Sequence, residues 1–250
     1  MNNNKKKKDI VIPEIDLEDI ESIVSKGVKP KISFITYLKE SFKEIGFKNI
    51  FHDKAELTII ILVGIILLLI PMVNFGDLDI SDLYKFTFIV SPMIYLSAVI
   101  FSFYNSKEKG AFDIEMTCKY NLYQLSALRM FVFSIASILI NTFSIIIIGV
   151  IGRNIDVIRM IIISIAGLFI FSTIFLYSLL NLKWSFSKYF VIGGWLCINI
   201  LLSNMDNKIY EEFLIKAPLY IHLIISGICM ILYIKNLNKL ISYRRKKGEI

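Results

Sequence analysis

Few residues of this chain have the types and spacing that catalysis or metal binding requires. The chain has two histidines, His52 and His222, and they lie far apart in the sequence. Metal sites in proteins need several clustered His, Cys or carboxylate ligands, so this spacing argues against one. None of the 12 glycines begins a Gly-x-x-x-x-Gly-Lys-Ser/Thr loop, which excludes ATP binding of the P-loop kind.

Two further patterns are similar to membrane-protease signatures, but neither fits them. A rhomboid-type serine protease would need Gly-x-Ser-Gly in the fourth apolar segment, but residues 161–175 read IIISIAGLFIFSTIF. Tyr210-Glu211-Glu212 is similar to the paired glutamates of CAAX-type membrane proteases, but it lies near the end of the chain without the further histidines of that site. We therefore expect this chain not to be an enzyme.

Long apolar segments dominate the sequence instead. Apolar residues make up 56% of the chain, and the mean hydropathy is +0.65. A hydrocarbon core of about 30 Å needs roughly 20 apolar helical residues for each crossing, and lipid forces backbone groups to bond within each segment. The sequence therefore predicts an all-α polytopic membrane protein with six transmembrane helices. These spans are expected at 57–74, 86–104, 128–150, 158–180, 187–203 and 217–235.

Polar and sulfur-containing side chains within these spans have modest expected roles. Asn141 and Asn199 lie in mid-span, where we expect hydrogen bonds between helices rather than substrate contacts. Cys197 and Cys229 lie within spans and Cys118 lies in a loop, so the three cysteines form no disulfide framework. We expect them to act as small buried apolar residues.

The distribution of basic residues predicts the orientation of the chain. With six spans both termini share one side, and that side carries 23 of the 28 Lys and Arg residues. The positive-inside rule then predicts a multi-pass membrane protein with both termini cytoplasmic. The net charge of +7 is thus explained by topology, and we expect no binding to nucleic acid.

The chain before the first span forms a cytosolic arm, residues 1–56. It shows no apolar run followed by a cleavage site, so the first span is expected to serve as the insertion signal. Within the arm, residues 33–45 predict an amphipathic helix with Lys39 and Lys43 on its polar face. Its apolar face is formed by Phe34, Leu38, Phe42 and Ile45. Such a helix can lie in the headgroup plane of membrane lipid or pack on the protein's own cytosolic loops.

The longest segment between spans, residues 105–127, is also expected to be cytosolic. Asn121 can cap a new helix there, with Gln124 three residues later as its capping-box partner. From Leu122 this helix meets no breaker until Gly149. It is then longer than the bilayer core is thick, so its first turns should project into the cytosol as a contact point for another protein.

This layout resembles the membrane permease subunit of type-2 ABC exporters of the low-GC Gram-positive bacterial type. The resemblance implies that the protein lies in a bacterial cell membrane. In that family a glutamate lies on the extension of the second span. A Gly-Thr or similar pair and a short coupling helix follow, and a basic residue enters the third span. The stretch 115–130, EMTCKYNLYQLSALRM, is similar, although Met116 stands in place of the family's glycine. The resemblance implies that an elbow over residues 111–129 contacts an ATPase. Its contact residues would be Glu115, Thr117, Tyr120, Asn121, Tyr123, Gln124 and Arg129.

The resemblance also implies partners and a mechanism. A separate P-loop ATPase subunit would bind ATP and magnesium, while this chain itself binds no cofactor. A second permease subunit, identical or related, would complete the complex. ATP-driven closure would push residues 118–126 and rock the spans. Glu115 is then expected to pair with Lys39 or Lys43, or else to remain a solvated charge.

The same segments of the chain also fit a different class of function. The arm 1–56 could bind a soluble partner, with the six-helix domain 57–235 as its anchor and the tail 236–250 as a basic cytosolic end. The chain would then be a membrane-anchored regulatory or immunity protein that transports nothing. A neighbouring gene for a P-loop ATPase would favour transport over this alternative.

Overall fold

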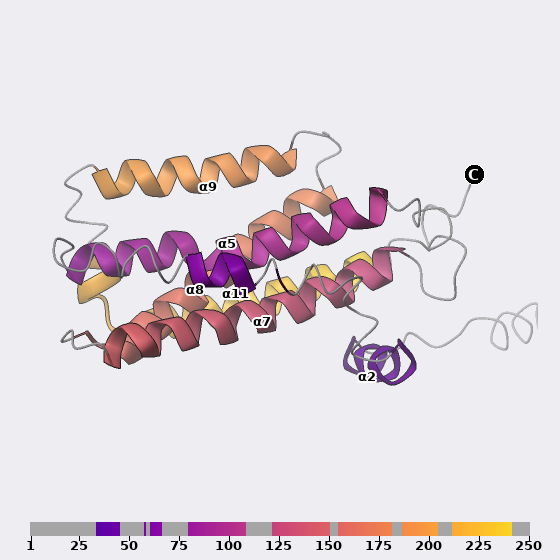
Figure 1. The fold of residues 1–250 in the computed structure, drawn as a ribbon, viewed down its shortest axis with the longest axis horizontal. Helices are drawn as coiled ribbons and strands as arrows, with labels where there is room; N and C mark the ends of the chain where they lie inside the picture. Colours follow the sequence, from indigo (N-terminus) through magenta and orange to yellow (C-terminus); the bar gives the residue numbers. More distant parts are fainter. Residues whose placement is uncertain are drawn as a thin grey trace, which may run out of the picture. The chain divides into compact units, whose positions relative to one another are not determined.

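The computed structural model describes residues 34–45, 58, 61–66, 80–108, 122–150, 155–181, 187–204 and 212–241. All secondary structure in these ranges is helical (Figure 1). The main elements are α2 (Phe34–Ile45), α5 (Ile80–Glu108), α7 (Leu122–Val150), α8 (Val157–Asn181), α9 (Ser187–Asn204), the π-helical turn η1 (Glu212–Lys216) and α11 (Leu219–Ile241).

Four of the described helices are long and apolar enough to cross a membrane. Their apolar stretches are Ile80–Phe101, Gln124–Val150, Val157–Asn181 and Leu219–Ile241. The apolar part of α9, Tyr189–Ser203, is shorter and would span only about 22 Å at 1.5 Å per residue. Most of the expected first span, 57–74, lies outside the described residues, so the structure supports a membrane-embedded helical protein without establishing six spans.

Two helix boundaries match the expectation closely, and two differ from it. α7 runs from Leu122 to Val150 without a break, and α8 covers the span expected at 158–180. α5 begins at Ile80, six residues before the expected span, because its first turns bury Leu83 and Tyr84. α11 continues past residue 235 to Ile241, because Leu237 and Leu240 extend its buried face at helical spacing and so shorten the expected tail.

Helices that follow one another in the sequence run in opposite directions, and contacts near the helix ends show which termini meet. Near one end of the bundle, the Tyr84 hydroxyl at the start of α5 lies 3.5 Å from the Asp156 carbonyl oxygen, just before α8. Arg159, in the first turn of α8, bonds the Ala217 carbonyl oxygen just before α11. At the opposite end, Lys239 of α11 bonds Asn181 of α8 at 2.8 Å. Thus α5, α8 and α11 start at the same end, as an up-and-down bundle requires.

The central element of this bundle is α8. It packs against α5, α7, α9 and α11, which explains why apolar residues occur on all its sides. Ile163, Leu168, Phe171 and Leu176 are fully buried along its length. A helix that is apolar all round belongs in a core or a membrane, and α8 is placed in a core.

The amphipathic helix expected at 33–45 is present as α2. The chain divides into two compact units, Met1–Ser41 and Phe42–Ile250, and α2 crosses the boundary between them. Lys39 and Lys43 are exposed, whereas Leu38 and Phe42 are half-buried. This exposure pattern agrees with a polar and an apolar face. The side chains of Phe34 and Ile45 are outside the described set.

Candidate functional site

The most unusual feature of the bundle is a proline in the middle of α5. Pro92 has no N–H, so the carbonyl oxygen of Phe88, four residues earlier, loses its ordinary helical donor. Gly167 of α8 packs at this point, and a Cβ atom added to it would lie only 2.8 Å from the Phe88 oxygen. The absence of a side chain at Gly167 therefore lets α8 approach the turn of α5 that proline leaves incompletely bonded. We call residues 88–92 the Pro92 turn.

Side chains of two other helices donate hydrogen bonds to this turn. Asn141 Nδ2 of α7 donates to the Ser91 carbonyl oxygen at 3.1 Å. Trp195 Nε1 of α9 donates to the Ile89 carbonyl oxygen at 3.2 Å. The turn itself donates to α8, from Ser91 Oγ to the Ser164 carbonyl oxygen at 2.6 Å. The Pro92 turn is thus bonded to three neighbouring helices.

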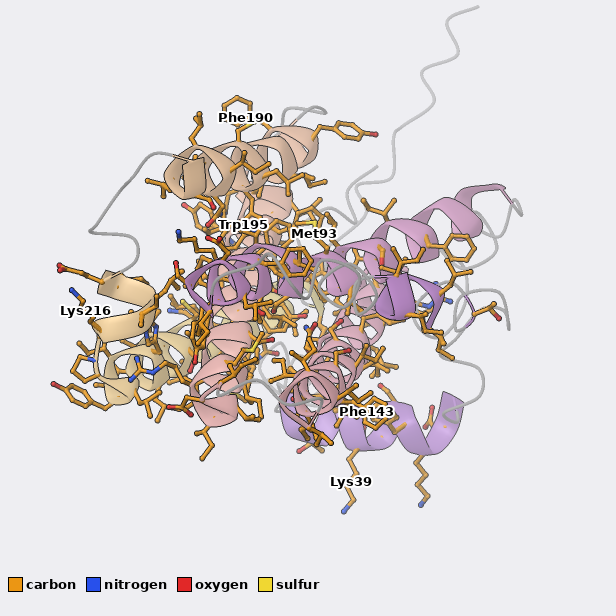
Figure 2. The ribbon with its side chains drawn as sticks, turned by 60° about the vertical axis from the view of Figure 1, so that its left-hand side comes forward. Lys39, Met93, Phe143, Phe190, Trp195 and Lys216 are labelled. Carbon is orange, nitrogen blue, oxygen red and sulfur yellow. The ribbon has the colours of Figure 1, made fainter. Side chains whose placement is uncertain are left out.

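Aromatic packing reinforces the α9 contact. The ring of Trp195 lies 5.4 Å from that of Phe88 and 5.5 Å from that of Phe171, the latter edge-on at 70°. Figure 2 shows Trp195 on the side of α9 that faces α5, with Phe190 on the opposite side. Phe190 is 79% exposed. One face of α9 therefore joins the bundle, and the other is turned outward.

A small cavity of about 30 Å³ lies beside the Pro92 turn, between α5 and α7. This volume holds about one water-sized group. Its polar lining residues are Thr87, Ser91, Asn141 and Ser144. Its remaining lining residues are apolar, namely Leu83, Phe86, Val90, Ile94, Ile145, Ile148 and Met160. Among the described residues that line the cavity, none has a titratable side chain.

A second polar contact lies farther along α5 and ties it to α7 and α11. The Tyr233 hydroxyl of α11 donates to the Met130 carbonyl oxygen of α7 at 3.0 Å and lies 3.4 Å from the Tyr95 hydroxyl. Tyr95 and Tyr233 are fully buried, and their rings meet edge-on at 6.3 Å. This tyrosine pair fixes the first turns of α7 to the remainder of the bundle.

Charged residues at the other end of the bundle form local pairs. Lys85 lies 3.3 Å from Asp82, Arg159 lies 3.8 Å from Asp156, and Lys216 lies 3.0 Å from Glu212. In the described ranges, each basic side chain at this end therefore has an acidic neighbour.

Arg159 has a further structural role at this end of the bundle. Its Nη1 donates to the carbonyl oxygens of Ile215 and Ala217, at 2.5 and 2.9 Å, where η1 ends. These oxygens would otherwise lack helical donors. His222 supports the same turn, because its Nε2 lies 3.0 Å from the Phe213 carbonyl oxygen. Both side chains thus hold η1 against the bundle.

The structure describes only part of the expected ATPase contact. Glu115, Thr117, Tyr120 and Asn121 lie outside the described residues, and of Tyr123 only the helical backbone is described. Gln124 is half-buried in α7. Arg129, the basic residue expected at the entry to the third span, is 4% exposed. The side chains from Ser126 to Arg129 in the first turns of α7 are therefore buried among other helices.

The remaining expectations within the spans have mixed outcomes. Asn141 does form the expected hydrogen bond between helices. Asn199 donates to the Trp195 carbonyl oxygen of its own helix at 2.8 Å. Cys197 is exposed rather than buried, because it lies on the outward face of α9. Within the ranges that the structure covers, no cluster of His, Cys or carboxylates could hold a metal ion.

Sequence reasoning overlooked the Pro92 turn. The available signal was Ser91-Pro92 in the middle of an apolar segment, since proline in the interior of a helix frees a backbone carbonyl. The roles of Gly167 and Trp195 had no comparable signal, because the residues they contact lie far away in the sequence. No family model matches the chain, and neither a curated protein nor a solved structure matches it.

Proposed function

We propose that this chain is the permease subunit of an ATP-driven exporter of the type-2 ABC kind. The observation that best supports the proposal is α7, a helix of 29 residues with no break. At 1.5 Å per residue it is about 43 Å long, which exceeds the hydrocarbon core by more than two turns. A force applied at its first turns would therefore reach deep into the bundle.

The tyrosine pair attaches the first turns of α7 to other helices of the bundle. Met130 lies near the start of α7, and its carbonyl oxygen accepts the hydrogen bond from Tyr233 of α11. Tyr95 of α5 contacts the same tyrosine. A displacement of the elbow 111–129 would therefore move α7, α11 and α5 together. Such rigid-body motion is the kind of step that alternating access requires.

In this proposal ATP and magnesium belong to a separate P-loop ATPase. This chain supplies the elbow, and a second permease subunit, the same chain or a relative, completes the pathway. Membrane lipid contacts the exposed apolar side chains of α9 and α11, which include Phe190, Ile224 and Ile231. α2 lies in the headgroup plane, where its exposed Lys39 and Lys43 meet anionic lipid.

The decisive experiment is purification of the tagged full-length chain from native membranes in mild detergent, with mass spectrometry of stoichiometric partners. We expect a P-loop ATPase to co-purify. Replacing Glu115 by Lys should abolish the stimulation of that ATPase without preventing membrane insertion. Lys216→Gln is the matched control, because its exposed pair with Glu212 lies at the opposite end of the bundle from the start of α7. It should leave stimulation unchanged.

The alternative function makes the opposite prediction for the same purification. A membrane-anchored regulatory or immunity protein should bring down a soluble partner through the arm 1–56, and no ATPase. Reproducible absence of an ATPase from complexes that contain the intact chain would overturn the permease proposal. Loss of the ATPase on substitution of residues 118–126 would support it.

The orientation part of the proposal is tested separately by cysteine labelling. In a Cys197→Ser, Cys229→Ser background, Cys118 is the remaining thiol and is expected on the cytoplasmic side. A membrane-impermeant maleimide should then label it in inverted vesicles and not in intact cells. Lys208→Cys, with Cys118→Ser added to the same background, is the matched control. The maleimide should label it in intact cells and not in inverted vesicles.

A further inference from the structure

The cavity beside the Pro92 turn contains more hydrogen-bonding capacity than the described residues around it use. Asn141 Nδ2 donates a hydrogen bond to the Ser91 carbonyl oxygen at 3.1 Å. Within the described ranges, Asn141 Oδ1 and the hydroxyls of Thr87 and Ser144 have no hydrogen-bond partner. All three groups belong to residues that line one cavity between α5 and α7.

This arrangement differs from that of other serines in the same helices. Ser97 of α5, Ser134 of α7 and Ser226 of α11 each donate to a carbonyl oxygen three residues earlier, at 2.7 to 2.9 Å. Such a local bond is the ordinary way for a helical hydroxyl to be satisfied in an apolar environment. Thr87 and Ser144 do not form this bond. Their hydroxyls are left available to a molecule in the cavity, where an unpaired polar group would otherwise be costly.

The lining also defines the chemistry of the occupant. The described lining residues include no Asp, Glu, Lys, Arg or His, so they would offer no countercharge to an ionised group that entered the cavity. The space of about 30 Å³ admits one small polar group. The remaining walls are apolar, including Val90, Ile145 and Ile148. A hydroxyl fits these conditions, because it can donate to Asn141 Oδ1 and accept from Thr87 or Ser144.

We propose that this cavity is a binding site for the hydroxyl group of an uncharged amphiphile, such as a long-chain alcohol or a monoacylglycerol. The hydroxyl occupies the polar end of the cavity, and the chain lies along the apolar surfaces of α5 and α7. The proposal is independent of transport, because it rests on the lining of the cavity and on no ATPase contact.

The test uses the full-length protein in nanodiscs of zwitterionic lipid. The probe is a long-chain alcohol with a photoreactive diazirine in its chain, and the cross-linked peptides are identified by mass spectrometry. We expect labelling of α5 and α7 around the cavity, with competition by unlabelled alcohol. The alkane and the ionised fatty acid of equal length should not compete at the same concentration.

Substitutions that remove only hydroxyl groups identify the site. Thr87→Val and Ser144→Ala should each weaken alcohol binding by about fivefold, the effect of one ordinary hydrogen bond. Ser97→Ala and Ser226→Ala are matched controls, because those hydroxyls bond their own helices, and they should leave binding unchanged. These four changes avoid Asn141, whose replacement could disturb the Pro92 turn.

Three results would overturn the proposal. Equal competition by the alkane would show simple partitioning into an apolar groove. Binding that is unchanged by both Thr87→Val and Ser144→Ala would place the alcohol elsewhere. If unlabelled alcohol does not compete with the photoreactive alcohol, the cavity holds water alone.

Discussion

Gly167 of α8 lies directly against the backbone carbonyl oxygen of Phe88 of α5, so that an added Cβ would be 2.8 Å from that oxygen and 3.2 Å from the Phe88 ring. The contact pairs a residue without a side chain with a carbonyl that Pro92 deprives of its helical donor. Two sequence features on different helices, a proline and a glycine, thus combine to bring the helix backbones close together. Small residues at such crossings are typical of helix packing in membranes.

Replacing Gly167 by Ala tests this contact. The new methyl group would push against backbone rather than against a flexible side chain, so α5 or α8 must move. We expect a net loss of about 1–3 kcal/mol of stability from overpacking, despite the better helix propensity of alanine. The measurement is thermal unfolding of the purified protein in detergent.

The matched control for Gly167→Ala is Gly227→Ala. Gly227 of α11 has nothing within 4 Å of its ideal Cβ position. The control should therefore be neutral or slightly stabilising. Equal melting temperatures for the two variants would contradict the close approach at Phe88.

Trp195 provides a second test of the Pro92 turn. Trp195→Phe keeps an aromatic ring near Phe88 and Phe171 but removes the hydrogen bond to the Ile89 carbonyl oxygen. Side-chain hydrogen bonds between membrane helices are worth about 0.6 kcal/mol on average, so a loss of ~0.5–2 kcal/mol is expected. Phe190→Leu, on the outward face of the same helix, should change the unfolding midpoint much less. If both variants melt alike, the indole hydrogen bond contributes nothing.

Helix positions were largely predictable from the sequence because membrane spans depend on local composition. The uninterrupted run from Leu122 to Gly149 became α7, and the span expected at 158–180 became α8. Boundaries at the ends were less predictable, since they depend on tertiary burial. Leu240 of α11 shows this, because it is 8% exposed although it lies beyond the apolar run.

The candidate site was far less predictable than the helices. Asn141 was identified as a contact between helices, since few polar groups occur in mid-span, and the structure confirms it. Its partner at Ser91 depends on which helices are neighbours, which no local pattern encodes. The burial of Arg129 likewise depends on which helices pack beside the start of α7, and no local pattern encodes that.

Arg159 should be more important for local structure than the ion pair beside it. Arg159→Lys keeps a positive charge near Asp156 but cannot reproduce the two bonds from Nη1 to Ile215 and Ala217. Hydrogen bonds to charged groups are worth about 1.5–3 kcal/mol each. We therefore expect faster amide hydrogen exchange across η1 and the first turn of α11.

Lys216→Gln is the comparison for Arg159→Lys. It removes an exposed pair with Glu212 in the same turn, and such pairs are worth about 0–1 kcal/mol. Its exchange pattern should remain close to that of the unaltered protein. Greater exchange in Lys216→Gln than in Arg159→Lys would show that the exposed pair, and not the arginine, holds η1.

The tyrosine pair can be measured with a double-mutant cycle. Tyr233→Phe removes the donor to the Met130 carbonyl oxygen and the contact with the Tyr95 hydroxyl, so it should cost about 1 kcal/mol or more. Tyr95→Phe removes only the second of these contacts and should cost less. The two substitutions should also be non-additive, because the hydroxyls lie 3.4 Å apart and both side chains are fully buried.

The cycle also separates stability from function. If α7 transmits force to α11 through Tyr233, then Tyr233→Phe should reduce stimulation of a co-purified ATPase. This should hold at a temperature where the protein remains folded. Ser226→Ala, which removes a hydroxyl bonded within α11 itself, is the matched control and should leave stimulation intact. Stimulation that survives in Tyr233→Phe would show that force enters the bundle by another contact.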